Sequence, residues 1–197
     1  MQGTTKTSPV AIKERIESIR ENGIDVLSRT LYLSGEITNE TADVLFKLES
    51  LDRASGPITI YLCTGGGDSQ VGYAIHDMIA SMKNKVTIIG MGSVQSIGAI
   101  ILQAADTRLL SPNTMFMIHH GSVELESKTQ TIDNITMMSR QYAVDNEIYY
   151  SILSKRSGLS RKDIVRYCKL ERLFTAKEAV ECNFADGILE GVKNGNT

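Results

Sequence analysis

Hydrophobic and polar positions follow two different periods in the first half of the chain. Short apolar runs, typical of buried strands, end in small or polar loops, and apolar residues then recur at helical spacing. The expected strands are 29–35, 57–62 and 86–90, and the expected helices carry their apolar residues over 44–51, 71–79 and 97–105. Strands that alternate with helices in this way predict an α/β fold.

The second half of the chain has a different pattern. Short strands are expected at 107–112 and 115–118, and a polar stretch covers 122–130. A long helix is expected over 132–155, ended by Gly158, and its length indicates that it projects from the main body. Two short helices are predicted from capping-box patterns, Ser160 with Asp163 and Thr175 with Glu178.

The two ends of the chain are expected to lie outside the core. Residues 1–24 combine a polar tail with an amphipathic helix that carries isoleucines at positions 12, 16 and 19, and residues 191–197 are interpreted as a frayed tail. With 197 residues, the chain is long enough for one well-packed domain and short for two. We therefore expect a single domain over 1–197.

Composition argues against several classes of function. The 21 basic and 23 acidic residues are well mixed and give a net charge of -2, so the basic stripe of a nucleic-acid binder is missing. The three cysteines show no C-x-x-C spacing and only three histidines are present, which supports neither a disulfide framework nor a zinc site. No apolar stretch reaches the roughly 20 residues that span a bilayer, and the start lacks a signal-peptide core. A cytoplasmic location without membrane or nucleic-acid partners is expected.

Ser96 is expected at the turn between a buried strand and a buried helix. Helix N-termini present unpaired backbone N–H groups with positive partial charge, which suits an oxyanion beside a serine nucleophile. The alternative is a serine that caps the helix. His119 follows an apolar strand and is a candidate base for this serine, although a histidine satisfied within the core fits the same pattern. His120 competes for the role, because neighbouring residues of a strand point to opposite sides.

Three consecutive glycines, 65–67, follow the expected strand 57–62. They allow another backbone to approach closely, and their N–H groups are free for an anion. Neither the G-x-x-x-x-G-K-[ST] pattern of a phosphate loop nor a G-x-G-x-x-G pattern is present, so a nucleotide site is not expected. An oxyanion hole and a plain turn both remain open. Spacing alone does not choose the carboxylate that a catalytic histidine needs.

A set of motifs, taken in order along the chain, resembles the proteolytic subunits of the Clp protease. They are Gly66-Gly67, Gly92-x-x-x-Ser96-Ile-Gly98, Pro112-Asn113, Met117-Ile-His119 and the segment 174–180. The resemblance covers roughly residues 25–190 and implies a ClpP/crotonase-type fold of repeated β-α units, with a handle region over 122–158. The crotonase fold, which includes enoyl-CoA hydratases, shares the small-residue loops but does not ordinarily call for this serine and histidine.

The resemblance implies an acyl-enzyme mechanism in which Ser96 is the nucleophile and His119 is first the general base and then the acid. The backbone N–H groups of Gly66 and Ile97 are the implied oxyanion donors. An extended substrate is expected to pair as an added strand between two segments. These segments supply the implied substrate-binding residues Gly67, Asp68, Ser69, Gly121, Ser122, Val123 and Leu125.

The third catalytic residue is where this sequence departs from the family. The family's catalytic aspartate aligns with Glu171, which is one methylene longer. Asp163 is interpreted as a helix cap and Asp186 as a turn residue, so Glu171 is the preferred member of a Ser-His-Glu triad. The family's Asp-Arg pair, which helps to couple two stacked rings, is replaced by Lys169 and Leu170, so that contact cannot form in the usual way.

The implied assembly is a pair of heptameric rings, stacked as a tetradecamer through the long helices, that cleaves unfolded polypeptides in its chamber. An AAA+ Clp unfoldase is the implied partner and would use the ATP, so the subunit itself is expected to need neither cofactor nor metal. Two alternatives remain open. A catalytically impaired structural subunit of a mixed ring would keep the fold without the chemistry, and a crotonase-type acyl-CoA enzyme would need a CoA pocket.

Overall fold

A computed structural model describes residues 9–121 and 129–190. The predictions for the tail 191–197, for residues 1–8 and for the substrate-binding residues Ser122, Val123 and Leu125 lie outside these ranges. Within them, strands and helices alternate as the sequence predicts, and the α/β class is confirmed.

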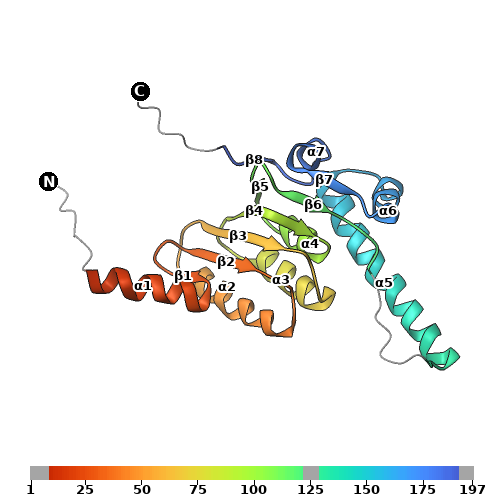
Figure 1. Cartoon of the computed structure of the whole chain (residues 1–197), viewed down its shortest axis with the longest axis horizontal. Coiled ribbons are helices and arrows are strands. Elements are labelled where there is room, and N and C mark those ends of the chain that lie inside the picture. Colours follow the sequence, from red (N-terminus) through yellow and green to blue (C-terminus); the bar gives the residue numbers. More distant parts are fainter. Residues whose placement is uncertain (1–8, 122–128, 191–197) are drawn as a thin grey trace.

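A mostly parallel sheet forms the centre of the molecule (Figure 1). Its main strands are β1 Ile24–Asp25, β2 Thr30–Ser34, β3 Ile58–Thr64, β4 Val86–Gln95, β5 Thr107–Leu110 and β8 Gly187–Ile188. They lie side by side in that order, with β1 antiparallel to β2 and each later strand parallel to its neighbour. Alternate residues of β3 are buried, which is the period of two that a strand imposes.

Strand β4 is long enough to pair with two partners along one edge. Its first half pairs with β5, and its last residues pair with the short strand β6, Met115–Met117. A further strand, β7 Leu173–Thr175, runs antiparallel to β6. The carboxyl end of β4 is therefore bordered by β3 on one side and by β6 on the other.

Helices pack around this sheet. They are α1 Pro9–Asn22, the 3-10 helix η1 Asn39–Asp43, α2 Val44–Asp52, α3 Ser69–Ser81, α4 Ile97–Gln103, α5 Ile132–Ser157, α6 Arg161–Lys169 and α7 Ala176–Glu181. In Figure 1, α2 and α3 lie side by side beneath the strands, and α6 and α7 lie beside β7.

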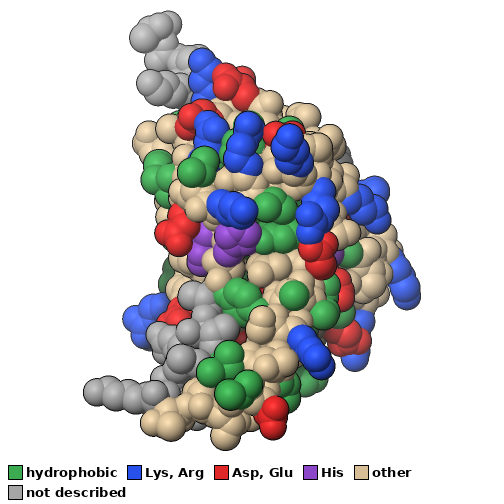
Figure 2. Space-filling model, turned by 90° about the vertical axis from the view of Figure 1, so that its right-hand side faces the viewer, with side chains coloured by type: hydrophobic (Ala, Val, Ile, Leu, Met, Phe, Trp, Pro, Cys, Tyr) green, Lys and Arg blue, Asp and Glu red, His purple; other side chains and the backbone are tan. Residues whose placement is uncertain are grey.

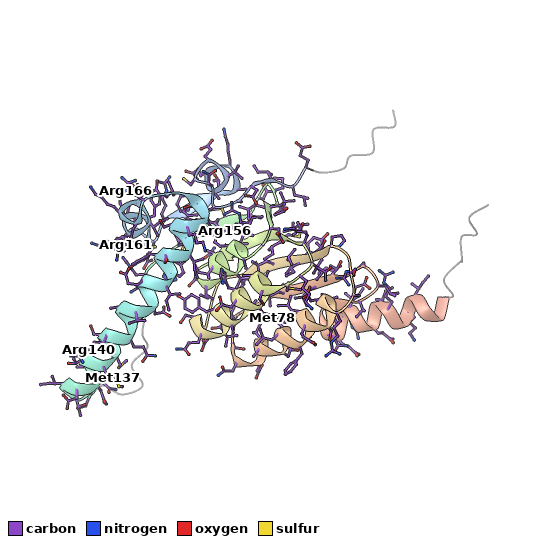
Figure 3. All side chains as sticks on the ribbon, turned by 180° about the vertical axis from the view of Figure 1, so that it is seen from behind. Met78, Met137, Arg140, Arg156, Arg161 and Arg166 are labelled. Atoms are coloured by element: carbon purple, nitrogen blue, oxygen red, sulfur yellow. The ribbon has the colours of Figure 1, made fainter. Side chains whose placement is uncertain are left out.

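The long helix α5, which we call the handle helix, projects from the sheet as its length predicts (Figure 1). Its buried residues lie in its C-terminal half and are Tyr149, Tyr150, Leu153 and Ser157. At the opposite end Ile132 is 82% exposed, and Figure 3 shows Met137 and Arg140 there, away from the sheet. Within the described residues, the helix is thus anchored through its C-terminal half, and the side chains of its N-terminal half are mostly exposed.

A cluster of three phenylalanines fixes the C-terminal segment to β6. Phe116, Phe174 and Phe184 are fully buried, and their ring centroids lie between 5.1 and 6.0 Å apart. Rings at these separations stabilise a core beyond the area that they bury. The cluster therefore steadies the strand that leads to the two histidines.

Some elements differ from the sequence predictions. Strand β4 continues from the expected end at 90 to Gln95, because its last residues pair with β6. It passes through a segment whose small residues indicate a loop, and Gly92 within it adopts φ 68°. The expected strand 107–112 ends at Leu110, and the expected helix 132–155 continues to Ser157. Strands β1 and β8 are too short for hydrophobic periodicity to reveal.

The expected amphipathic helix near the start is present as α1, but its apolar residues are not all covered. Ile12 and Ile16 are 47% and 58% exposed. Over residues 9–121 and 129–190, no helix is both long and apolar enough to cross a membrane. In that same part of the chain, no cluster of three or more His, Cys, Asp or Glu side chains is arranged to hold a metal ion.

Candidate active site

Ser96 occupies the tight turn between β4 and α4. Its backbone has φ 55° and ψ -126°, which a non-glycine residue rarely adopts and which is typical of strained functional turns. Its N–H donates to the Met117 carbonyl at 3.0 Å. Its own carbonyl accepts from the Ala99 N–H at 3.0 Å and from the Tyr149 hydroxyl at 3.1 Å. The side chain makes no capping hydrogen bond to α4, so the helix-cap alternative is not what the structure contains.

The pairing of β6 with the end of β4 brings His119 to Ser96. Gln95 and Met117 are partners across these strands, so the residues that follow each strand emerge at the same edge of the sheet. His119 Nε2 lies 2.7 Å from Ser96 Oγ. This is a hydrogen bond between an imidazole and a hydroxyl, the geometry in which a base takes the hydroxyl proton.

The adjacent histidine turns away from the serine. His120 Nδ1 shares a hydrogen bond with the Tyr150 hydroxyl on the handle helix, and the two rings meet edge to face with centroids 5.7 Å apart. Burial lowers the pKa of His120, and the nearby Lys169 and His119 lower it further. His119 therefore faces Ser96, while His120 faces the handle helix. Figure 2 shows the face on which histidine side chains lie together, bordered by hydrophobic and basic residues.

The glycine loop after β3 lies against the serine. A Cβ atom placed on Gly66 would come within 2.5 Å of Ser96 Cβ and 3.0 Å of its Oγ, so a larger residue does not fit. The Gly66 N–H donates to Thr64 Oγ1 at 3.0 Å. Ile97 is the first residue of α4, so its N–H has no partner within the helix. Both implied oxyanion donors thus border Ser96, but the one on Gly66 is engaged by the Thr64 hydroxyl.

Gly67 has one backbone edge that no hydrogen bond uses within residues 9–121 and 129–190. It forms a parallel bridge with Ile37, whose N–H donates to the Gly66 carbonyl at 2.8 Å and whose carbonyl accepts from the Asp68 N–H at 2.7 Å. In a parallel bridge of this kind the N–H and C=O of the middle residue point the other way. Gly67 therefore presents a donor and an acceptor on the side away from Ile37, as pairing with an added strand requires.

A cleft of about 470 Å³ opens beside the Ser96 and His119 pair. The expected substrate-binding residues that the structure describes all line it, namely Gly67, Asp68, Ser69 and Gly121. Its opposite wall comes from the handle helix, whose Asp145, Asn146 and Tyr149 were not singled out in the sequence. The cleft is therefore built by the glycine loop on one side and by the handle helix on the other.

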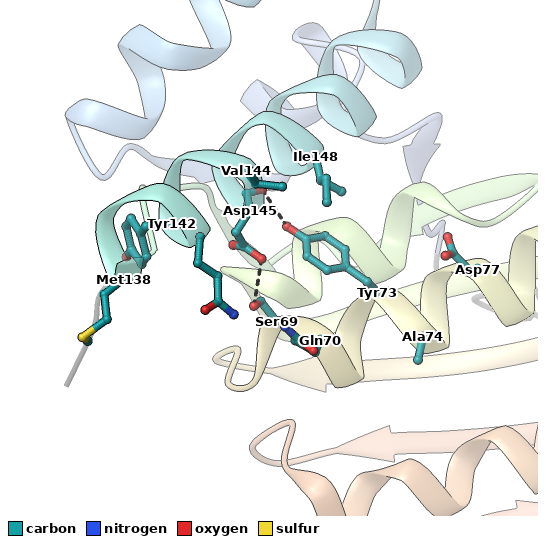
Figure 4. A pocket seen from close by; sticks show the side chains of 11 residues that line it. Ser69, Gln70, Tyr73, Ala74, Asp77, Met138, Tyr142, Val144, Asp145 and Ile148 are labelled. Carbon is teal, nitrogen blue, oxygen red and sulfur yellow. Dashed lines mark hydrogen bonds between the residues drawn. The ribbon is translucent and has the colours of Figure 1, made fainter. Parts of the chain in front are cut away.

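A second hollow of about 600 Å³ lies between α3 and the handle helix and shares part of its lining with the cleft (Figure 4). Two hydrogen bonds join the helices there. The Ser69 hydroxyl donates to Asp145 Oδ1 at 3.1 Å, and the Tyr73 hydroxyl donates to the Asp145 carbonyl at 3.1 Å. Burial raises the pKa of Tyr73, and the nearby Asp145 raises it further, so this phenol stays a hydrogen-bond donor.

Glu171 lies in the turn that follows α6, with φ 46° and an exposed side chain. In the part of the chain that the structure describes, its carboxylate makes no hydrogen bond to either histidine. The same turn nevertheless reaches the histidine segment through the backbone. The Ile118 N–H donates to the Arg172 carbonyl at 3.5 Å, and the His120 N–H donates to the Cys168 carbonyl at 3.3 Å.

The two rival carboxylates have structural partners. Asp163 and Ser160 exchange hydrogen bonds at the start of α6, as the cap prediction requires. Asp186 is more than a turn residue, because it forms an ion pair with the buried guanidinium of Arg108. Neither carboxylate is therefore available to the histidine in this arrangement.

The sequence and the fold of this chain are similar to those of known proteins. Residues 17–192 match the family model described as Clp protease. The "ATP-dependent Clp protease proteolytic subunit 2" of Treponema pallidum is 31% identical over 169 residues, which cover 83% of this chain and 83% of that protein. The corresponding subunit 3 of Rhizobium meliloti is 34% identical over 156 residues, covering 77% and 78%. Among solved structures, a mutant of ClpP1 from Listeria monocytogenes matches with a TM-score of 0.77 and 29% identity, covering 85% of this chain and 94% of that one.

Proposed function

Because the chain belongs to the Clp protease family, we propose that it is a serine endopeptidase that cleaves unfolded polypeptides through an acyl-enzyme. The observation that carries the proposal is the 2.7 Å contact between Ser96 Oγ and His119 Nε2 at a strained turn beside a cleft. A serine that merely caps a helix has no need of this backbone strain or of this partner.

The chemistry begins at the Ser96 hydroxyl. His119 Nε2 takes its proton as Oγ attacks the carbonyl carbon of the peptide, and the imidazolium then gives that proton to the departing amine. The product is an ester between Ser96 and the acyl half of the substrate. Water, activated by the same imidazole, hydrolyses this ester and restores the hydroxyl.

The oxyanion that forms on the attacked carbonyl needs preorganised donors. We assign the N–H groups of Ile97 and Gly66, each worth about 3 kcal/mol in comparable sites. The Gly66 N–H is held by Thr64 Oγ1 at 3.0 Å, so the Thr64 hydroxyl has to turn aside when substrate binds. The substrate itself would pair, as an added strand, with the edge of Gly67 that faces away from Ile37, which gives main-chain recognition with broad sequence tolerance.

Glu171 is our candidate for the group that orients His119. Asp163 and Asp186 are held by Ser160 and Arg108, whereas Glu171 is exposed on a turn that is hydrogen-bonded to the histidine segment. An ionised carboxylate at Nδ1 would fix the imidazole tautomer and stabilise the imidazolium. We further propose that the subunit uses no cofactor and that it works in stacked heptameric rings fed by an AAA+ Clp unfoldase that uses ATP.

The Glu171 carboxylate is not hydrogen-bonded to His119 in the described structure, and this favours one alternative. It is a structural subunit that keeps the fold and the ring contacts but has impaired chemistry. The two functions differ in peptide hydrolysis. We expect the purified wild type to cleave a short fluorogenic peptide and to react with a fluorophosphonate probe, and Ser96→Ala to do neither. Glu171→Ala should lose most of its activity, whereas Glu181→Ala, which removes an exposed glutamate on α7, should not.

Assembly size has to be measured with every variant, so that loss of chemistry is separated from loss of rings. If the wild type assembles but neither cleaves the peptide nor reacts with the probe, the structural subunit is the correct function. If Glu171→Ala matches the wild type while Ser96→Ala is inactive, the enzyme is a serine peptidase whose histidine is oriented by another group.

A further inference from the structure

We propose that Tyr149 is a positioning residue that holds the peptide group between Ser96 and Ile97 from the handle helix and so directs the Ile97 N–H to the oxyanion site. The inference rests on the proposed function, because an oxyanion forms there only if Ser96 is a nucleophile. It assigns a role in the reaction to a residue of the handle helix that lies next to the reacting groups.

Tyr149 is placed to do this by burial and by a directed hydrogen bond. Its side chain is 6% exposed, and its hydroxyl donates to the Ser96 carbonyl oxygen at 3.1 Å. It also lines the cleft that contains Ser96 and His119. Burial raises the pKa of Tyr149 well above its ordinary value, so the phenol keeps its proton and remains a donor near neutral pH.

The effect on Ile97 follows from the geometry of the peptide bond. The group that joins Ser96 to Ile97 is planar and trans, so its C=O and its N–H point in opposite directions. A donor that fixes the Ser96 carbonyl on one side thereby fixes the Ile97 N–H on the other. This is the N–H that begins α4 and has no partner within that helix.

The turn needs an external support because its conformation is unfavourable. Ser96 has φ 55°, in a region that L-residues rarely occupy. Its carbonyl also accepts from the Ala99 N–H, within the first turn of α4, and its N–H donates to the Met117 carbonyl at the end of the paired strand β6. Tyr149 adds a third contact from an element that is distant in sequence, and it ties the position of the handle helix to the reacting groups.

Tyr73 provides a matched control. Its hydroxyl also donates to a backbone carbonyl at 3.1 Å, that of Asp145, and it also joins the handle helix to the body of the protein (Figure 4). Among the described residues, its hydroxyl makes no hydrogen bond to Ser96 or Ile97. Tyr73→Phe and Tyr149→Phe therefore remove the same kind of bond between the same two parts of the molecule, and only the second reaches the turn.

The experiment measures peptide cleavage and amide hydrogen exchange in the wild type, Tyr149→Phe and Tyr73→Phe, with assembly size recorded. Tyr149→Phe should lower kcat by about tenfold to a hundredfold with KM little changed, because the lost alignment acts in the transition state. Exchange in the segment 94–101 should become faster in the same variant. Tyr73→Phe should keep kcat within about twofold and leave exchange over 94–101 unchanged.

Equal kinetics and equal exchange in the two variants would overturn the inference, as would a rise in KM alone for Tyr149→Phe. A wild type that does not cleave the peptide would refute the proposed function instead. In that case Tyr149 has no oxyanion site to support. The exchange measurement still decides whether Tyr149 holds the turn, because it requires no catalysis.

Discussion

The contact between Gly66 and Ser96 makes a quantitative prediction for a single added methyl group. In Gly66→Ala, the new Cβ would lie 2.5 Å from Ser96 Cβ, whereas ordinary contacts begin near 3.4 Å. The glycine loop or the serine must therefore move by about 0.9 Å, the difference between these two distances. Ser96 is held by hydrogen bonds to Met117, Ala99 and Tyr149, so the displacement cannot be absorbed by a free side chain.

The expected cost falls on catalysis. A misplacement of about 1 Å at a reacting group lowers the rate by roughly a hundredfold. Alanine at the Gly66 backbone angle of φ 113° adds strain of about 1–3 kcal/mol to the fold, which has to be separated from the steric effect. Gly35→Ala supplies that separation, because Gly35 has φ 95° and a Cβ there meets nothing within 4 Å.

The assay compares kcat for a fluorogenic peptide and urea unfolding in the two variants. Gly66→Ala should lose at least as much stability as Gly35→Ala, because the clash adds to the same backbone strain, and only Gly66→Ala should lose activity, by about a hundredfold. The reasoning is refuted if Gly66→Ala retains the activity of Gly35→Ala at equal assembly, since the loop would then not set the position of the nucleophile.

Two further predictions concern stability. Hydrogen bonds from Arg15 lower the pKa of Asp25 to about 2 despite its burial, so this carboxylate stabilises the fold above its unfolded pKa of about 3.9 and loses the effect as the pH falls toward 2. Urea midpoints measured from pH 5 to pH 2 should fall more steeply for the wild type than for Asp25→Asn, and parallel curves would contradict the assignment. Asp186→Ala should cost about 3 kcal/mol of unfolding free energy, because it removes the carboxylate partner of the Arg108 guanidinium, which is 6% exposed and keeps, among the described residues, only its bonds to Gln103 and Asn183. A loss below about 1 kcal/mol would place this pair among ordinary surface pairs.

The fold was largely predictable because the residues within most elements carry the hydrophobic pattern that identifies the element. Strand β3 alternates buried and less buried residues, and the handle helix has the length and the terminal Gly158 of a long projecting helix. The end of β4 was not predictable, because its pairing with β6 is a contact between segments that are remote in sequence. Without that partner, the glycines at 90 and 92 indicate a loop.

In the site, too, the residues with a local sequence pattern were predictable, and those placed only by tertiary contacts were not. Ser96 at a strand-to-helix turn and His119 at a strand end are local patterns, and the fold brings the two side chains within 2.7 Å. Asp145 and Tyr149 lie on the handle helix, far from the glycine loop in the sequence, and only the tertiary structure places them along the cleft. The sequence around Tyr149 offers one local signal of a special position, the adjacent pair Tyr149 and Tyr150 within a polar helix. This pair does not indicate that Tyr149 lies beside Ser96.

The backbone around Glu171 bears on how this glutamate could replace an aspartate. The hydrogen bonds from Ile118 to Arg172 and from His120 to Cys168 leave His119 opposite the three intervening residues 169–171. Those extra residues are accommodated by a turn in which Glu171 adopts φ 46°, so its backbone is fixed beside the histidine segment while its side chain extends outward. Only side-chain torsions then remain to be set, and a glutamate samples more positions than an aspartate but loses more rotamer entropy when it is held. On the proposed function, the ordering of this one side chain by substrate or by ring contacts is the step that would complete the triad.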